Sequence, residues 1–350
     1  MYQELKIEQT ASIADALKQM DIVRRKLLMV FDDSKFIALL SIGDIQRAII
    51  NNFDLKTDIK SILRNDYIYA NVSESEESIK QKMLSLRAEF MPVLDDEDQL
   101  VKVYFWEDLF GVRQQPPKNQ FDVPVVIMAG GLGTRLKPLT NVLPKPLIPI
   151  GDKTIIENIF ERFAQHGSTN FYISVNYKAE LIEYYLKEQK LPYQLHFFKE
   201  GKPMGTAGSL SLLKNKIKET FFVSNCDIVI EEDYSEILEY HRENKNEITI
   251  VAALKSISIP YGTILSGKEG ELLELVEKPE INFKINSGMY ILEPQVINEI
   301  PEDIFFHITQ LIEKIKGRGG KVGVFPVSEK SWKDIGEWNE YLSVINEKRN

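Results

Sequence analysis

The chain has 350 residues, of which 43% are hydrophobic and 27% are charged, and its formal net charge is −9 at pH 7. The length predicts two or three domains, and the hydrophobic fraction is sufficient for true cores. The acidic balance argues against non-specific binding to nucleic acid or to anionic membranes. One cysteine excludes an internal disulfide, and four scattered histidines argue against a zinc site. Without a long apolar run or a signal-peptide pattern, we expect a cytoplasmic protein.

The N-terminal third of the chain contains a weak internal repeat. Each copy predicts a helix, two strands joined by an acidic turn, and a closing helix, and the copies lie about 64 residues apart when Asp44 is read onto Asp108. In the first copy the opening helix starts within 10–17, where apolar residues recur at helical spacing. We therefore expect an α+β module built from two copies of one unit, residues 1–60 and 61–112.

This repeat resembles a pair of CBS domains, which often bind a regulatory adenine nucleotide. The Ser/Thr-x-x-Asp pattern that holds the ribose in that family is present in the first copy as Ser41 and Asp44. In the second copy the matching positions are Phe105 and Asp108, so an aromatic ring replaces the hydroxyl group. Two interpretations stay open: a regulatory nucleotide bound at Ser41 and Asp44, or a pair that only packs and assembles the chain into a homo-oligomer.

A polar segment with two prolines, residues 113–122, has the composition of a linker. In the second domain that follows, residues 123–350, strand and helix patterns alternate. This alternation predicts a Rossmann-like α/β fold with a mostly parallel sheet covered on both faces. The predicted strands include 171–175, 193–198, 221–227 and 271–276, and the predicted helices include 154–163 and 179–187.

The most informative segment is 125–146, where an apolar, β-branched run precedes three glycines within four residues. The run predicts a buried parallel strand. The glycines leave backbone N–H groups exposed, and such groups form a concave anion site. Arg135 adds a cationic fork for phosphate oxygens, and Lys145 adds a compact charge between two prolines. These features predict a site for a polyphosphate.

Two common phosphate-binding loops do not match this segment. The Walker pattern ends in Gly-Lys-Ser/Thr, whereas Gly133 is followed by Thr134 and Arg135. The dinucleotide fingerprint needs a third glycine at the position of Leu136. A glycine-rich turn without a ligand is the structural alternative, and the charged residues and the downstream motifs argue against it.

The sequence Gly-Gly-Leu-Gly-Thr-Arg-Leu-Lys-Pro-Leu-Thr at 130–140, followed by Pro-Lys-Pro at 144–146, resembles the signature of the sugar-1-phosphate nucleotidyltransferases. That family has a GT-A-like fold, joins a nucleoside triphosphate to a sugar 1-phosphate and releases pyrophosphate. The resemblance implies a nucleotide site in the glycine loop and in a second loop near residue 205. Its residues are Ala129, Gly130, Gly131, Gly133, Thr134, Arg135, Lys145, Glu200, Gly205, Thr206 and Ala207.

Two aspartates form the predicted metal site. Asp227 follows a buried strand, and in open α/β sheets ligands bind outside the carboxyl ends of the strands. Asp334 matches the second metal-binding position of the resembled family. Mg²⁺ prefers few protein ligands together with substrate oxygens, so this pair suits a Mg²⁺ cofactor. The structural alternatives are a turn residue for Asp227 and a helix cap for Thr206, and Cys226 is expected to be buried and inert.

The resemblance also implies a sugar site. Glu277 and Lys278 correspond to family residues that bind the sugar hydroxyls and the sugar phosphate, although such a pair is ordinarily a solvated surface pair. Tyr261, Gly262 and Asn286 fall in segments that close over the sugar. No general base is expected, because a phosphate oxygen is already ionised at pH 7. The implied catalytic residues are Arg135, Lys145, Asp227 and Lys278.

The order of the two domains points to a more specific group within the resembled family. A nucleotidyltransferase that follows a CBS pair is similar to the CBS-bearing guanylyltransferases that make GDP-glucosamine for legionaminic acid biosynthesis, which implies GTP and glucosamine 1-phosphate as substrates. A uridylyl-, thymidylyl- or cytidylyltransferase acting on another sugar 1-phosphate is the alternative. A catalytically silent, nucleotide-sensing subunit is an alternative of another class, and the intact phosphate loop and both aspartates argue against it.

Overall fold

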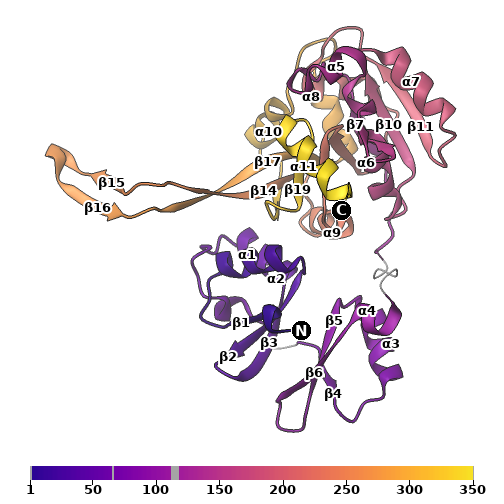
Figure 1. Ribbon diagram of the computed structural model, residues 1–350. Coiled ribbons are helices and arrows are strands. Elements are labelled where there is room, and N and C mark those ends of the chain that lie inside the picture. The colour runs from indigo at the N-terminus through magenta and orange to yellow at the C-terminus, as the bar shows by residue number, and fades with distance from the viewer. Residues whose placement is uncertain (1, 65–66, 112–117, 350) are drawn as a thin grey trace. The chain divides into compact units, whose positions relative to one another are not determined.

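The structure is a computed structural model that describes residues 2–64, 67–111 and 118–349 (Figure 1). The chain divides into two compact units, residues 1–118 and 119–350. Part of the predicted linker, 113–117, lies outside the described residues, as do positions 65, 66 and 112 of the predicted second repeat. No helix among the described residues combines the length and the apolar character needed to cross a membrane.

The first unit consists of two halves with the same topology. In each half, one strand pairs parallel with a second strand, which pairs antiparallel with a third. The first half contains β1 (Lys6–Glu8), α1 (Ile13–Val23), β2 (Leu27–Asp32), β3 (Lys35–Ser41) and α2 (Ile42–Ile50). The second half contains β4 (Ala70–Asn71), α3 (Glu76–Leu86), β5 (Phe90–Leu94), β6 (Leu100–Phe105) and α4 (Trp106–Phe110). The repeat in the sequence is therefore a repeat of structure.

Reciprocal capping boxes start both helices of the first half. At α1, the Ser12 hydroxyl accepts a hydrogen bond from the backbone N–H of Asp15 (3.1 Å), and the Asp15 carboxylate accepts one from the backbone N–H of Ser12 (3.1 Å). Ser41 and Asp44 form the same arrangement at α2. Each box satisfies N–H groups that a helix start leaves unpaired, which fixes where the helix begins.

A seven-stranded sheet forms the centre of the second unit, in the order β11-β10-β7-β12-β17-β14-β18. Its pairs are parallel except that β17 runs antiparallel to both of its neighbours, so the predicted mostly parallel sheet is confirmed. The strands are β7 (Val125–Met128), β10 (Asn170–Val175), β11 (Gln194–Lys199), β12 (Phe221–Asn225), β14 (Ile248–Ser258), β17 (Glu280–Leu292) and β18 (Val322–Val327).

Both faces of this sheet are covered. Along β7, Val125 and Ile127 belong to one core cluster and Val126 to the other, because successive side chains point to opposite faces. The first face packs against α6 (Ile155–Ala164), α7 (Ala179–Glu188), α9 (Tyr234–Glu243) and α11 (Trp338–Arg349). The second packs against α10 (Ile308–Gly317) and the short helix α8 (Gly205–Gly208). This double covering explains why the strands read as continuous apolar runs.

Short elements complete the second unit. The predicted helix at 154–163 is α6, which Thr154 caps together with Glu157. Two small antiparallel pairs, β8 with β9 and β13 with β19, lie outside the central sheet. These elements are α5 (Leu139–Val142), β8 (Pro149–Ile150), β9 (Lys153–Thr154), β13 (Ile228–Ile230) and β19 (Trp332–Asp334).

A long two-stranded arm leaves the central sheet (Figure 1). Its strands are the outer ends of β14 and β17, which pair as far as Ser258 and Glu280. Further out, β15 (Thr263–Ser266) pairs with β16 (Leu272–Val276), so the strand predicted at 271–276 exists but belongs to a separate two-stranded sheet. We refer to residues 254–284 as the arm.

Candidate active site

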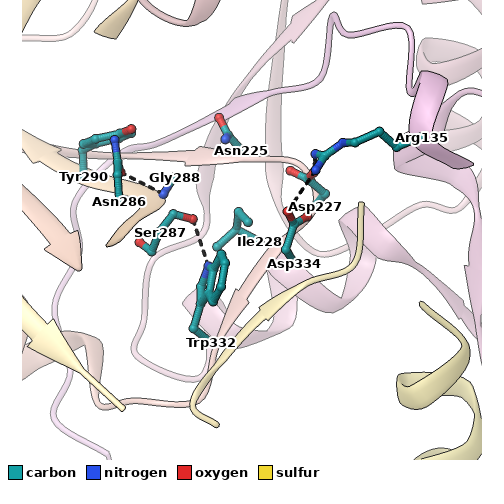
Figure 2. A pocket seen from close by; sticks show the side chains of 10 residues that line it. All are labelled: Arg135, Asn225, Asp227, Ile228, Asn286, Ser287, Gly288, Tyr290, Trp332 and Asp334. Atoms are coloured by element: carbon teal, nitrogen blue, oxygen red, sulfur yellow. Dashed lines mark hydrogen bonds and ion pairs between the residues drawn. The ribbon is translucent and has the colours of Figure 1, made fainter. Parts of the chain in front are cut away.

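A pocket of about 190 Å³ lies at the carboxyl ends of β7 and β12, where ligands bind in open α/β sheets (Figure 2). Its lining combines side chains from the strands of the sheet with side chains from β13 and β19, which come from distant parts of the chain. The lining residues are Arg135, Asn225, Asp227, Ile228, Asn286, Ser287, Gly288, Tyr290, Trp332 and Asp334.

The two predicted metal ligands meet in this pocket. β13 pairs antiparallel with β19, so that Ile228 stands opposite Asp334, and the backbone N–H of Ile335 donates to the carbonyl oxygen of Asp227 (2.9 Å). Asp227 is 6% exposed, and its carboxylate forms an ion pair with the buried ammonium of Lys145. A small two-stranded pairing therefore brings together carboxylates that are far apart in the sequence.

Gly336 permits this close approach. A Cβ atom at position 336 would overlap the Asp227 carboxylate and the Lys145 ammonium, and it would lie 2.8 Å from Oδ1 of Asp334. The backbone N–H of Gly336 donates to that same Oδ1 (2.9 Å). The absence of a side chain therefore leaves the space in which three charged groups converge.

Electrostatic repulsion and burial both act on Asp334. Burial raises the pKa of its carboxyl group, the nearby Asp227 carboxylate raises it further, and Arg135 partly opposes these effects. A carboxylate pair of this kind favours a cation between its members. In the described residues the neighbouring cations are Arg135 and Lys145, which both contact Asp227.

Arg135 extends over the carboxylates from the short helix at Thr134–Leu136 (Figure 2). Its Nη1 lies 3.3 Å from Oδ2 of Asp334 and also pairs with Glu337, while Nη2 lies 3.6 Å from Oδ2 of Asp227. Burial alone would lower the pKa of Arg135, but the hydrogen bond with Glu337 and the two aspartates leave it raised. The guanidinium is half exposed, so it can turn toward a ligand.

The glycine loop is held in place by its neighbours. Gly133 has a φ of +64°, and a Cβ there would lie 2.8 Å from the Thr140 side chain, so the turn requires glycine. The Thr140 hydroxyl donates to the Gly133 carbonyl (2.9 Å). By contrast, a Cβ at Gly131 would meet nothing within 4 Å. The loop is thus rigid at Gly133 and open at Gly131, as a phosphate-binding loop needs to be.

Glu200 packs against the beginning of this loop. A Cβ at Gly130 would lie 2.8 Å from Oε1 of Glu200. The Glu200 carboxylate also accepts hydrogen bonds from the Ser174 hydroxyl and from the backbone N–H of Met204 (3.3 Å). Ala129, just before the loop, is buried, and its N–H donates to the Ser174 carbonyl (3.1 Å). Glu200 therefore connects the first loop with the second, and Ala129 joins the first loop to β10.

The second loop differs in one respect from the sequence interpretation. Thr206 does not cap the helix in which it lies, because α8 begins at Gly205 after Met204. Instead its hydroxyl accepts a hydrogen bond from the backbone N–H of Ile308 (3.0 Å), the first residue of α10. The N–H of Ala207 donates to the carbonyl of Phe306 (3.0 Å). The structural alternative of a helix cap at α8 is therefore not observed, and Thr206 instead joins the loop to a distant helix.

The structure separates the predicted sugar residues. Asn286 lines the pocket, where its side chain accepts a hydrogen bond from the Gly288 N–H (3.1 Å). Tyr261, Gly262, Glu277 and Lys278 instead lie on the arm, away from the pocket lining, and all four are exposed. Within this chain the four residues on the arm are therefore not brought together with Asn286, because β14 and β17 run outward without folding back.

Several site residues were not singled out from the sequence. Trp332 donates from Nε1 to the carbonyl oxygen of Ser287 (3.0 Å), which joins β19 to the pocket edge of β17 (Figure 2). Glu337 pairs with Arg135, although an exposed glutamate carries no special signal in a sequence. Trp332 and Glu337 both lie close to Asp334 in the sequence. Their closeness to this predicted metal ligand was the one signal that could have pointed to them.

Ser41 and Asp44 are close together in the first unit. The Asp44 carboxylate accepts hydrogen bonds from the Ser41 backbone N–H (2.9 Å) and hydroxyl (2.6 Å). Its other oxygen pairs with Arg47 and lies 2.7 Å from Nε of Arg64. In the second half, the Asp108 carboxylate accepts a hydrogen bond from the backbone N–H of Phe105 (3.0 Å), and the phenylalanine at this capping position has no hydroxyl group to donate a second one. The two halves are therefore chemically unequal at these matching positions.

The carboxylate pair also has the donor set that Mg²⁺ requires. Asp227 and Asp334 supply hard oxygen ligands that converge beside Gly336. The pKa of Asp334 is raised by burial and by the Asp227 carboxylate, and a bound cation would reduce the repulsion between the two carboxylates. No group of three or more possible ligands occurs among the described residues. The pair of carboxylates that is present fits Mg²⁺, because that ion commonly takes one or two carboxylates and completes its shell with phosphates and water.

These features agree with the comparisons to known proteins. Residues 124–350, well over half of the chain, match the nucleotidyl transferase family, and the chain therefore belongs to that family. Mannose-1-phosphate guanylyltransferase 1 of Arabidopsis thaliana is 32% identical over 229 residues, which cover 63% of each protein. A mannose-1-phosphate guanyltransferase of Yarrowia lipolytica is 39% identical over 184 residues, which cover 50% of each. The chain spans less than two thirds of the length of these relatives.

A solved structure resembles the same part of the chain. HddC from Yersinia pseudotuberculosis, complexed with GMP-PN, is 28% identical and superposes with a TM-score of 0.51. The match covers 65% of this chain and 99% of that chain. The α/β fold predicted for the second unit is thus a known nucleotidyltransferase fold.

Proposed function

We propose that this chain transfers GMP from GTP to a sugar 1-phosphate, giving a GDP-sugar and pyrophosphate. The observation that carries the proposal is the convergence of Arg135, Lys145 and the two aspartates beside an open glycine loop, in a member of the nucleotidyl transferase family. Guanine is the favoured base because the relatives carry guanylyltransferase names and the similar solved structure was obtained with GMP-PN.

The proposed reaction is an in-line displacement. An oxygen of the sugar 1-phosphate forms a bond to the α-phosphorus of GTP, the bond from that phosphorus to the bridging oxygen breaks, and pyrophosphate leaves with the bonding electrons. No proton has to be removed, so the chain needs no general base. Its work is to position two anions and to offset their charge.

Each cation has a distinct proposed task. The half-exposed guanidinium of Arg135 turns from Asp334 and Glu337 toward the β- and γ-phosphates, which the backbone N–H groups of Gly131–Thr134 also bind. The buried ammonium of Lys145 stays beside Asp227 and offsets negative charge at the α-phosphate. Asp227 and Asp334 would hold Mg²⁺, which when bound supplies positive charge to the phosphate oxygens.

Two sugars are candidates. The order of a CBS-like pair followed by a transferase resembles enzymes that use glucosamine 1-phosphate in legionaminic acid biosynthesis. The names of the curated relatives favour mannose 1-phosphate instead. The β17 side of the pocket is lined by Asn286, Ser287, Gly288 and Tyr290, and these uncharged residues suit a sugar hydroxyl and an amino substituent equally.

For the first unit we propose a regulatory nucleotide site at Ser41 and Asp44. The support is the pair of half-exposed guanidinium groups of Arg47 and Arg64 beside the aspartate, since such groups bind phosphate readily. A ribose hydroxyl would share the Asp44 carboxylate with the Ser41 hydroxyl. A pair of CBS-like halves that only packs and assembles a homo-oligomer is the competing role.

The direct test is pyrophosphate release by the full chain. GTP, UTP, dTTP and CTP are each combined with glucosamine, mannose and glucose 1-phosphates in the presence of Mg²⁺. We expect the highest kcat/KM with GTP and with one of the first two sugars. Absence of release with every pair, from protein that melts cooperatively, would overturn the proposed transferase activity. Preference for another triphosphate would overturn the choice of base alone.

A further inference from the structure

The arm is a continuous extension of the central sheet. β14 and β17 pair from Ile248 opposite Leu292 out to Ser258 opposite Glu280, with one irregularity between Ile250 and Ala252. Beyond β17, the N–H of Ile259 donates to the carbonyl of Pro279 (3.0 Å) and prolongs the ladder toward β15 and β16. The ladder does not bend back, so the arm keeps the direction of its strands (Figure 1).

This geometry keeps the arm away from the pocket of its own chain. Asn286 lines the pocket, and Glu280 lies six residues further out along the same strand, a separation of roughly 20 Å at the rise of an extended strand. Lys278 lies beyond Glu280. A lysine side chain is much shorter than this separation, so Lys278 cannot reach the pocket from which its own strand emerges.

One face of the arm is apolar and uncovered. The cross-strand pair Ile257 and Ile281 is followed on the same face by Phe283, and these side chains are 49%, 40% and 47% exposed. Further along that face, Ile285 packs against the core of the second unit. At the tip, Ile264 and Leu275 form another exposed cross-strand pair. An apolar surface of this size on a two-stranded ribbon is typical of an interface, since such a ribbon is barely stable alone.

The pocket, in turn, is short of positive charge. Arg135 and Lys145 contact three carboxylates, those of Asp227, Asp334 and Glu337, which leaves a surplus of one negative charge. The proposed reaction brings a triphosphate and a sugar phosphate into the same place, and together these anions carry more negative charge than the proposed Mg²⁺ offsets. Among the described residues, Lys278 forms no ion pair, although it lies next to Glu277 in the sequence. An available cation on the arm thus matches a deficit of positive charge in the pocket.

We infer that the arm docks at the pocket of a second copy of this chain and supplies Lys278 to the sugar phosphate bound there. The inference rests on the proposed transferase function. It adds that Lys278 comes from the second copy of the chain and not from the copy that binds the substrates. Identical copies can exchange arms about a two-fold axis, so each copy donates one arm and receives one. The arm, residues 254–284, is also comparable to the ~20–30 residues that each partner contributes to a standard interface.

Subunit complementation tests this inference. One tagged chain carries Lys278→Ala and a differently tagged chain carries Asp227→Asn; each variant alone should lose at least ~10²-fold in kcat, because charge stabilisation at the phosphates is removed. The two chains are then co-expressed and purified through both tags. In a mixed dimer with exchanged arms, one of the two sites keeps both residues, so activity should return to about half that of the wild type.

Two outcomes of this experiment overturn the inference. If the mixed dimers are as inactive as the single variants, Lys278 acts within its own chain or not at all. If no doubly tagged species is recovered, the chains do not assemble as proposed. Lys268→Ala is the matched control, since Lys268 is an exposed lysine on the same arm, and chains carrying it should keep wild-type activity.

A crosslinking measurement separates this inference from the proposed function. One tagged chain carries Lys278→Cys, the other carries Asn286→Cys, and a short bis-maleimide is added. Cys226, the single native cysteine, is buried, and burial raises its thiol pKa to about 12, so it stays unreactive. Arm exchange predicts a covalent dimer containing both tags. If the two cysteine variants crosslink but the wild-type chain is inactive on every substrate, the arm exchange stands and the proposed function is overturned. If the wild-type chain is active but the two variants do not crosslink, the function stands and the arm exchange is overturned.

Discussion

Each unit of this protein contains a buried aspartate that contacts two cationic side chains. Asp44 in the first unit is 4% exposed and pairs with Arg47 and Arg64. Asp227 in the second unit is 6% exposed and pairs with Lys145 and with Arg135. Burial and cationic partners are therefore shared, and they do not distinguish the two sites.

The difference lies in what else each carboxylate contacts. Asp44 also accepts hydrogen bonds from the backbone and hydroxyl of Ser41, so its lone pairs are used within its own helix cap. Asp227 instead faces a second carboxylate, Asp334, across an open pocket. The comparison teaches that a second like charge, rather than a buried charge by itself, indicates a site that a cationic ligand stabilises.

Removing the charge of Asp227 should have the largest effect on activity, and it tests whether this aspartate differs from Asp44 in function. Asp227→Asn should lower kcat by ~10²-fold or more, because the substitution removes charge from the proposed metal and phosphate site while keeping the size of the side chain. Steady-state kinetics at saturating Mg²⁺ measure the effect, and a thermal melt confirms that the variant is folded. Turnover close to wild type would rule out the two-aspartate assignment.

The two cations of the pocket should contribute differently to the stability of the folded chain. Arg135→Ala and Lys145→Ala should both lose activity, but Arg135 is half exposed, so its loss should hardly change the melting temperature. Lys145 is 8% exposed against the buried Asp227, and its removal should cost roughly 3 kcal/mol of unfolding free energy, because a buried carboxylate loses its partner. Chemical denaturation measures both variants. Equal stability of the two would contradict the structural role of Lys145.

In the first unit, a nucleotide titration tests whether Asp44 does more than cap α2. Calorimetry with adenine and guanine nucleotides should show binding to the full chain and at least ~10-fold weaker binding to Asp44→Ala, within the range of typical coupling energies. Asp15→Ala is the matched control, because it removes the same kind of capping box from α1 without touching the two arginines. Equal binding to all three proteins would leave the first unit with a packing role.

The smallest expected effect concerns the pH dependence of stability. The raised pKa of Asp334 means that the folded state holds this proton more tightly than the unfolded state, so the carboxyl group loses stabilising effect as pH rises above its ordinary range near 3.8. Asp334→Asn should therefore raise Tm at pH 7 by a few degrees or less. The difference should vanish below that ordinary pKa. A lower Tm for the variant at pH 7 would contradict the repulsion between the aspartates.

Much of this arrangement could be predicted from particular residues. The phosphate loop, Asp227 and Asp334 follow from a family signature and from the rule that ligands bind at the carboxyl ends of parallel strands. The helix starts predicted within 10–17 and at 154 agree with α1 and α6, because their caps form by local hydrogen bonding, which depends only on neighbouring residues. Local chemistry was therefore sufficient for the loops and for the start of several helices.

The remaining features depend on pairing between distant segments. The Thr206 hydroxyl accepts a hydrogen bond from the first backbone N–H of α10 because α8 packs against that helix, and no pattern around Thr206 contains this information. The arm was missed for a similar reason: the pattern at 271–276 predicted a strand but not its partner, and in the structure β15 and β16 form a separate two-stranded sheet. Apolar periodicity predicts that a surface will be covered, but it does not say which chain covers it.

Gly336 has a consequence for how natural variation and mutational scans of this protein are to be interpreted. Scans that truncate side chains detect groups that contribute by being present, and they pass over a position that has no side chain to remove. At position 336 the harmful change is the gain of a single methyl group, which would intrude on the carboxylate of Asp227 and the ammonium of Lys145. An inherited glycine-to-alanine exchange there should therefore act as a null allele, although it ranks among the mildest substitutions by any measure of amino-acid similarity.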